Sequence, residues 1–153
     1  MRLISLDISG EDNGTTGVCV FNSLNDFSVL DVEQNKFDCN SNYYKYTLDL
    51  VIEQKPDIVI IENYINYKDR SKAYTNQENK TSEMLGFLEH SLKNKGIKVE
   101  KFIANQYKDL VDRDFLTKCN ISTRGSSRHC KDAIKMCVFY TFWKKREENI
   151  WKN

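Results

Sequence analysis

The pattern of apolar and polar positions predicts three strands in the first part of the chain. Residues 2–9 alternate between apolar and polar side chains, as a half-buried strand does. A turn that ends at Gly17 follows, and residues 17–22 return as the second strand of an antiparallel hairpin. Apolar residues recur beside polar ones within 27–37, so we expect a third strand there.

The rest of the chain alternates between helical and strand-like patterns. The expected elements are a helix at 42–54, a strand at 58–61, a helix at 82–95, a strand at 97–103, and helices at 105–119 and 126–143. The run from Ile58 to Ile61 is apolar throughout, which is typical of a central parallel strand covered on both faces. Three antiparallel strands followed by strand–helix units predict an α/β fold, with a mixed five-stranded sheet flanked by helices.

Length and composition favour one folded domain spanning residues 1–153. No apolar run approaches the roughly 18–20 residues that span a membrane, and the N-terminus is charged too early for a signal peptide. We therefore expect a cytoplasmic protein with no membrane partner. Five cysteines, without a CxxC pair, fit a reducing compartment. A zinc site built from Cys130, Cys137 and the two histidines lacks the usual paired spacing.

Charge is distributed unevenly along the chain. Residues 1–62 carry 4 basic and 11 acidic side chains, whereas residues 118–153 carry 9 basic and 3 acidic ones. This asymmetry permits a polyanion-binding face on a protein whose net charge is only +1. A solvated, lysine-rich helical surface has the same composition, so charge alone leaves both interpretations open.

Two acidic side chains stand at the ends of predicted core strands. Asp7 lies on the face of the first strand opposite Ile4 and Leu6. Glu62 shares a face with Ile60 at the carboxyl end of a parallel strand, where functional crevices open. Each also has a plain structural interpretation, as a turn-capping aspartate or as a strand end that reaches water.

His129 and Asp132 lie one helical turn apart, on a face that leads into the apolar stripe of the last helix. A carboxylate at the head of a buried stripe costs free energy unless it is paired, hydrogen-bonded or bound to metal. If this helix crosses the sheet, Asp7, Glu62 and Asp132 converge, and their repulsion favours a bound cation. Such oxygen ligands suit Mg²⁺ or Mn²⁺, and a pair of ions can hydrolyse a phosphodiester. A lone histidine is more often a capping or hydrogen-bonded side chain, and that interpretation of His129 stays open.

These motifs resemble those of the RuvC-type Holliday-junction resolvases, within the RNase H-like superfamily. The resemblance rests on Leu6 to Gly10, Pro56 to Glu62 and His129 to Ala133, whose order and approximate spacing match over nearly the whole chain. It implies an RNase H-like fold with two bound Mg²⁺ ions, for which Mn²⁺ can substitute, and it places Lys108 near the scissile phosphate. The metal ligands that it implies are Asp7, Glu62, His129 and Asp132.

The chain departs from the bacterial members of that family in the turn after Asp7, which lacks their Asp-Pro-Gly sequence. The stretch between the fifth strand and the last helix also looks short. In both respects the chain looks more like compact phage-encoded relatives, which work in the cytoplasm of a host cell. No motor-protein partner is therefore carried over.

The function that the resemblance implies is metal-dependent cleavage of branched DNA, with paired nicks that resolve a four-way junction. A nearly twofold substrate needs two symmetric cuts, so we expect a homodimer, with the helix at 82–95 as its candidate interface. Aromatic and basic residues interleave directly after Glu62, where they suit stacking on bases and binding to phosphates, although a surface loop is the plainer interpretation. Basic residues around the last motif suit the flanking backbone or form a solvated helix face. The expected DNA contacts are Tyr64, Tyr67, Lys68, Arg70, Lys72, Tyr74, Arg124, Arg128 and Lys131, with Lys135 beside them.

Three other functions remain open from the sequence. Another RNase H-like nuclease would act on RNA–DNA hybrids or flaps. An actin-like phosphate-binding domain would use the turn after Asp7 with Thr15 and Thr16, although such enzymes normally need two domains of this kind. A non-catalytic junction-binding protein would bind branched DNA without cutting it.

Overall fold

The computed structural model describes residues 1–63 and 76–147, except for the side chains of 76–79, and within them five strands form one mixed sheet. The strand order is β3-β2-β1-β4-β5. The strands are β1 (Leu3–Asp7), β2 (Thr15–Ser23), β3 (Asp26–Glu33), β4 (Ile58–Glu62) and β5 (Lys98–Phe102). The pairs β1–β2 and β2–β3 are antiparallel, whereas β4 runs parallel to both β1 and β5. This is the predicted mixed sheet.

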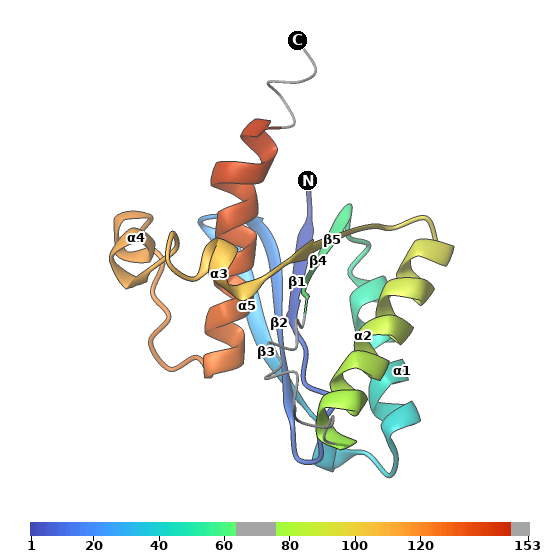
Figure 1. Ribbon diagram of the computed structural model, residues 1–153. Coiled ribbons are helices and arrows are strands. Elements are labelled where there is room, and N and C mark those ends of the chain that lie inside the picture. Colours follow the sequence, from blue (N-terminus) through green and yellow to red (C-terminus); the bar gives the residue numbers. More distant parts are fainter. Residues whose placement is uncertain (64–75, 148–153) are drawn as a thin grey trace, which may run out of the picture.

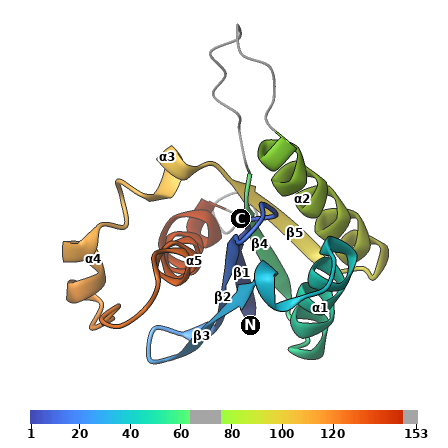
Figure 2. The same ribbon diagram turned by 90° about the horizontal axis from the view of Figure 1, so that it is seen from below.

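Helices cover both faces of the sheet, as Figure 1 and Figure 2 show. Helices α1 and α2 lie against one face, and α5 crosses the other, with α3 and α4 on the same side as α5. The helical elements are a 3-10 turn (Gln34–Lys36), α1 (Asn40–Glu53), α2 (Asn76–Asn94), α3 (Ala104–Tyr107), α4 (Arg113–Lys118), α5 (Arg128–Phe139) and a π-helical turn (Tyr140–Lys144). None of the helices in the described ranges is long and apolar enough to cross a membrane.

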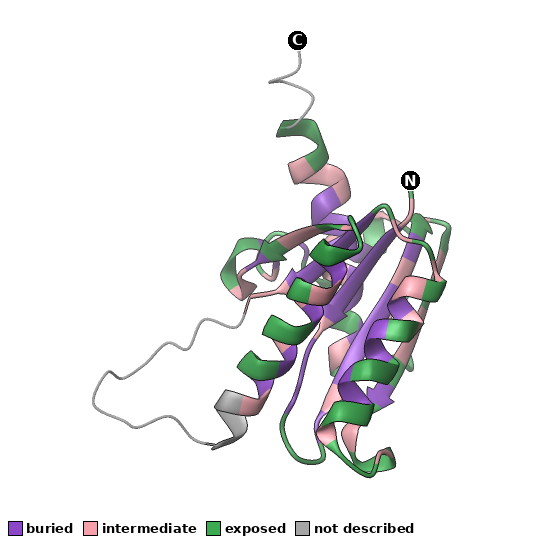
Figure 3. Ribbon diagram, turned by 90° about the vertical axis from the view of Figure 1, so that its right-hand side faces the viewer, coloured by how far each residue is buried: buried purple, intermediate pink, exposed green. Residues whose placement is uncertain are grey.

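The sheet separates two apolar cores, because successive side chains of a strand point to opposite faces. Ile4 and Leu6 of β1 pack with the buried side of α2, and Figure 3 shows these buried strands behind α1 and α2. Leu3 packs on the other face with Met136 of α5. Ser5, on the same face as Leu3, donates a hydrogen bond of 2.5 Å to the carbonyl oxygen of Ala133 and so joins β1 directly to α5.

Gly17 allows the first turn of α5 to lie directly on the sheet. A Cβ atom at this position would lie 2.3 Å from the carbonyl carbon of His129 and 2.6 Å from the backbone nitrogen of Cys130. Gly17 pairs with Asp7 of β1 on one side and with Asp31 of β3 on the other. The start of α5 therefore sits between two acidic side chains of the sheet.

Several predicted boundaries are wrong, and the most informative is the helix expected at 105–119. It is divided into α3 and α4, because Asp112 accepts a hydrogen bond of 2.8 Å from the backbone nitrogen of Phe115 and so begins a new helix. Helix α2 begins at Asn76, earlier than the expected residue 82. The prediction missed this start because the first turns of the helix are polar and show no apolar periodicity. The third strand ends at Glu33.

Candidate active site

Asp7 and Glu62 end two neighbouring parallel strands. Leu6 pairs with Ile61 in the ladder between β1 and β4, so the next residue of each strand lies beside the other. Alternation along the strands turns both carboxylates toward the face that α5 covers. Their side chains are only 15% and 19% exposed, so both carboxylates are largely removed from water.

The first turn of α5 brings His129 to Asp7. The imidazole Nδ1 lies 2.9 Å from Oδ2 of Asp7. Ser127 caps the helix by accepting from the backbone nitrogen of Cys130, and its hydroxyl donates to Asp31 of β3 at 2.7 Å. The hydrogen bond with Asp7 raises the pKa of His129 although burial opposes this. The charged imidazolium is therefore favoured beside Asp7.

A second set of contacts links Glu62 to Asp132 through the end of α3. The buried hydroxyl of Tyr107 donates a short hydrogen bond to Oε2 of Glu62. The ammonium nitrogen of Lys108 lies 3.0 Å from Oδ2 of Asp132 and 3.7 Å from Oε2 of Glu62. The end of α3 thus supplies two adjacent residues, Tyr107 and Lys108, that both contact Glu62, and Lys108 also pairs with Asp132.

The three carboxylates act on one another electrostatically. Burial raises the pKa of Glu62, and the charges of Asp7 and Asp132 raise it further. The hydrogen bond from Tyr107 and the ammonium group of Lys108 act in the opposite direction. For Lys108 itself, burial lowers the pKa, but the hydrogen bond to Asp132 and the nearby carboxylates outweigh burial, so its pKa is raised. The site therefore favours positive charge.

The chemistry of this donor set fits a divalent cation. In the described part of the chain, no three His, Cys, Asp or Glu side chains are already gathered closely enough to hold a metal ion. Lys108, however, places a cationic group between two of the carboxylates, where it stands in for an ion. Carboxylate oxygens are the ligands that Mg²⁺ and Mn²⁺ prefer. The residues that fit such an ion are Asp7, Glu62 and Asp132, with His129 beside them.

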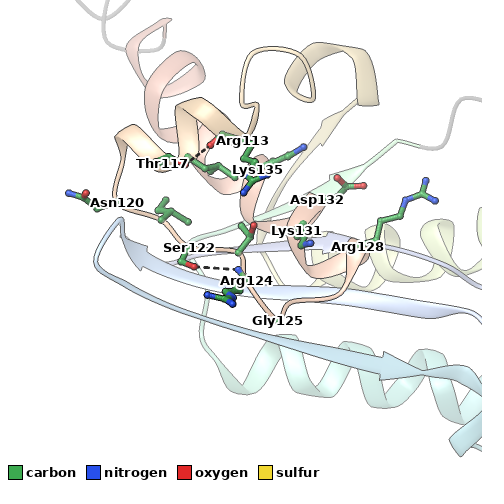
Figure 4. A pocket seen from close by; sticks show the side chains of 13 residues that line it. Arg113, Thr117, Asn120, Ser122, Arg124, Gly125, Arg128, Lys131, Asp132 and Lys135 are labelled. Carbon is green, nitrogen blue, oxygen red and sulfur yellow. Dashed lines mark hydrogen bonds between the residues drawn. The ribbon is translucent and has the colours of Figure 1, made fainter.

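A groove beside Asp132 gathers some of the predicted DNA-contact residues, as Figure 4 shows. It is a cavity of about 1090 Å³ between α4, residues 119–127 and α5. Arg124, Arg128, Lys131 and Lys135 line it. The remaining predicted contacts lie outside the described residues: Tyr64, Tyr67, Lys68, Arg70, Lys72 and Tyr74.

Three residues that contribute to this region were missed by sequence reasoning. Tyr107 and Arg113 lie in the stretch that was predicted as one continuous helix, so neither could be assigned to the site or to the groove. Asp31 carries no signal beyond its place on the third strand. The alternative zinc site is not assembled, because His90 lies on α2, across the sheet from Cys130.

Comparisons with known proteins identify the fold. No protein-family model matches the sequence, and no curated protein matches it. The structure is similar to that of Thermus thermophilus RuvC in complex with a Holliday junction substrate, with a TM-score of 0.70 and 14% identity over 95% of this chain and 96% of that chain. Another structure of Thermus thermophilus RuvC gives a TM-score of 0.66 at 14% identity, over 96% of this chain and 97% of that one.

A viral protein has the same arrangement. The fowlpox virus resolvase in complex with its substrate Holliday junction DNA matches with a TM-score of 0.52 and 14% identity, over 94% of this chain and 99% of that chain. At this identity the likeness shows the fold. The predicted α/β, RNase H-like fold is thereby confirmed.

Proposed function

We propose that this chain is a divalent-metal-dependent endonuclease that resolves four-way DNA junctions by paired nicks, with residues 1–153 as one nuclease domain. The observation that carries the proposal is the convergence of Asp7, Glu62 and Asp132 from β1, β4 and α5 on one side of the sheet. Two similar solved structures, from Thermus thermophilus and fowlpox virus, are complexes with Holliday junction DNA. They support a branched DNA substrate for the same fold.

In this proposal Asp7, Glu62 and Asp132 hold two Mg²⁺ ions. When bound, the ions supply Lewis-acid chemistry, which makes water a stronger nucleophile and stabilises charge on the leaving 3′-oxygen. His129 either completes the ligand set or orients the attacking water. Tyr107 holds the carboxylate of Glu62 in one orientation. Lys108, once released from the carboxylates, neutralises a phosphate oxygen at the scissile position.

The paired cuts require two copies of the site. A C2 homodimer presents two such sites to a nearly twofold junction. Helix α2 remains the candidate interface, because it contains the segment 82–95 that the sequence suggested. Sedimentation of the purified chain tests the dimer directly.

The decisive experiment is cleavage of a labelled synthetic four-way junction with and without Mg²⁺ or Mn²⁺. Asp7→Asn and Glu62→Gln should abolish cleavage while junction binding persists. Asp49→Asn, at an exposed carboxylate of α1, is the matched control and should cut normally. Full cleavage by either site variant would refute the site.

A panel of substrates separates the proposal from its rivals. Linear duplex, flaps and RNA–DNA hybrids are tested beside the junction under the same conditions. Preference for flaps or hybrids would identify another nuclease of this fold. Tight junction binding without a cut under any divalent metal would identify a binding protein.

A further inference from the structure

The groove beside Asp132 is strongly basic. We call it the basic groove and define it by Arg113 of α4, Arg124 of the connecting loop, and Arg128, Lys131 and Lys135 of α5. Asp132 is the only carboxylate among the described residues that line it. That carboxylate is already paired with Lys108 from outside the groove. The groove therefore presents five cationic side chains that its own lining does not neutralise.

These cations lack partners elsewhere in the described structure. Among the described side chains, those of residues 1–63 and 80–147, none forms an ion pair within 4.0 Å with any of the five. Three of these cations lie along α5, as on an ordinary solvated helix face, but Arg113 of α4 and Arg124 of the connecting loop line the same concavity, as Figure 4 shows. A concavity lined by one sign of charge raises the local concentration of anions and so favours a polyanionic ligand.

The wall formed by α4 is held in place by aromatic packing. The ring of Phe115 lies 5.3 Å from that of Phe142 and 5.2 Å from that of Trp143, centroid to centroid, so α4 is anchored to the π-helical turn that follows α5. Leu116 of α4 is buried in the core on the same side of the sheet. Both walls of the basic groove thus belong to one packed unit, and the groove is preformed.

The lining suits a sugar–phosphate backbone and not the bases. None of the described side chains that line the groove is aromatic, so none can stack on an unpaired base. Arginine, lysine and small hydroxyl or amide side chains are the groups that bind phosphate oxygens, and such contacts position DNA without reading its sequence. Because Asp132 borders both the groove and the carboxylate site, DNA in the groove would continue from the phosphate that is cut.

We propose that the basic groove binds the backbone of the DNA arm that is cut, beyond the scissile phosphate, and that it contributes affinity without contributing preference for junctions. This inference rests on the proposed function for the identity of the arm. It adds Arg113 of α4 to the DNA-binding surface, on the wall that faces Lys135 of α5.

Binding measured in EDTA over a series of salt concentrations tests the groove without any cleavage. The double variant Arg113→Gln/Lys135→Gln should weaken binding to a four-way junction and to a linear duplex by about the same factor. The slope of log affinity against log salt should fall by roughly 1–2, since each lost phosphate contact removes about 0.9. Lys118→Gln, on α4 but outside the groove, removes one charge and should leave the slope unchanged.

Two results would overturn the inference: an unchanged salt slope in the double variant, or a selective loss of junction binding with duplex binding intact. Junctions with progressively shortened arms test the position of the contact. Shortening should weaken wild-type binding until it equals that of the double variant, and should affect the double variant less. If the slope falls as expected but no substrate is cut with metal, the proposed function fails while the groove stands as a backbone-binding site.

Discussion

The ammonium nitrogen of Lys108 lies 3.0 Å from Oδ2 of Asp132, and the same group is within 3.7 Å of Glu62. These are two of the three carboxylates that would bind a divalent ion. The lysine is thus an internal counter-ion, and it would compete with a bound metal for the same oxygens. In the proposed function, Lys108 would leave this contact to reach a phosphate oxygen.

Replacing Lys108 by Met retains the aliphatic stem and removes the competing charge. We expect the variant to bind Mn²⁺ more tightly than wild type, by about tenfold, which corresponds to about 1.4 kcal/mol. Without metal its thermal stability should fall, because two largely buried carboxylates lose their partner. Calorimetric titration with Mn²⁺ and melting curves in EDTA measure both effects.

Lys101→Met is the matched control for this substitution. Lys101 lies on β5 and also pairs with a carboxylate, that of Glu89 on α2, which is not one of the candidate metal ligands. It should leave the affinity for Mn²⁺ unchanged. Weaker Mn²⁺ binding by Lys108→Met would mean that the lysine assists the metal instead of competing with it.

His129 should make the stability of the metal-free protein depend on pH. Its pKa is raised above the ordinary value of 6.5, mainly by the hydrogen bond with Asp7. A raised pKa means that the folded state holds the proton more tightly, so the stabilisation is complete below pH 6.5 and is lost as pH rises through the folded pKa. Urea unfolding in EDTA between pH 6 and 9 should show this loss in wild type and a flatter profile in His129→Gln.

The same proton should oppose metal binding. The affinity for Mn²⁺ should therefore increase over the pH range in which His129 loses its proton, and this increase should be smaller in His129→Gln. If stability and Mn²⁺ affinity depend on pH equally in wild type and His129→Gln, then His129 is not the group whose proton stabilises the fold and opposes metal binding.

The sequence was sufficient to predict the sheet and the faces of its carboxylates. Strand residues alternate strictly, so Asp7 is opposite Ile4 and Leu6, and Glu62 is on the face of Ile60, in the structure as predicted. The spacing of His129 and Asp132 likewise placed both on the inner face of α5. These local periodicities are fixed by backbone geometry, and tertiary contacts did not alter them.

The contacts made by the segment after β5 could not be predicted, because they depend on where a helix stops. Helix α3 ends at Tyr107 and its C-cap, Lys108, reaches two carboxylates, whereas Asp112 begins a separate helix. The same break sets α4 across from α5 and brings Arg113 into the basic groove. An N-cap within a helix-forming sequence is a weak local signal, yet here it begins the helix that carries Arg113 into the groove.

Tyr107 should stabilise the ionised form of Glu62. Removing its hydroxyl in Tyr107→Phe leaves a largely buried carboxylate without its donor, which should cost about 1–2 kcal/mol of unfolding free energy at pH 7. The pKa of Glu62, already raised by burial, should rise further. Because a raised carboxyl pKa penalises the charged form, the loss of stability should be larger at neutral pH than in acid.

A double-mutant cycle with Glu62→Ala isolates this interaction, because alanine, unlike glutamine, cannot accept a hydrogen bond from the Tyr107 hydroxyl. The coupling energy from urea unfolding of the two single variants and the double variant should be of the same size as the loss in Tyr107→Phe, about 1–2 kcal/mol. Additive effects would show that the hydroxyl of Tyr107 stabilises the protein without acting through Glu62.

Gly17 offers the sharpest test of how the site is positioned, because it separates backbone approach from chemistry. In Gly17→Ala the new Cβ would lie 2.3 Å from the carbonyl carbon of His129, and backbone cannot yield as a flexible side chain can. The first turn of α5 must therefore move away from β2, which carries His129 from Asp7 and Asp132 from Lys108. We expect a loss of about 1–3 kcal/mol of stability, together with weaker Mn²⁺ binding and slower junction cleavage, although no candidate ligand is altered. Gly86→Ala is the matched control, because it makes the same chemical change on the exposed side of α2, where a Cβ meets nothing within 4 Å. Its higher helix propensity should stabilise the protein by up to about 1 kcal/mol. The affinity for Mn²⁺ should be unchanged. Normal Mn²⁺ affinity in Gly17→Ala would mean that the close approach of α5 to the sheet does not position the ligands.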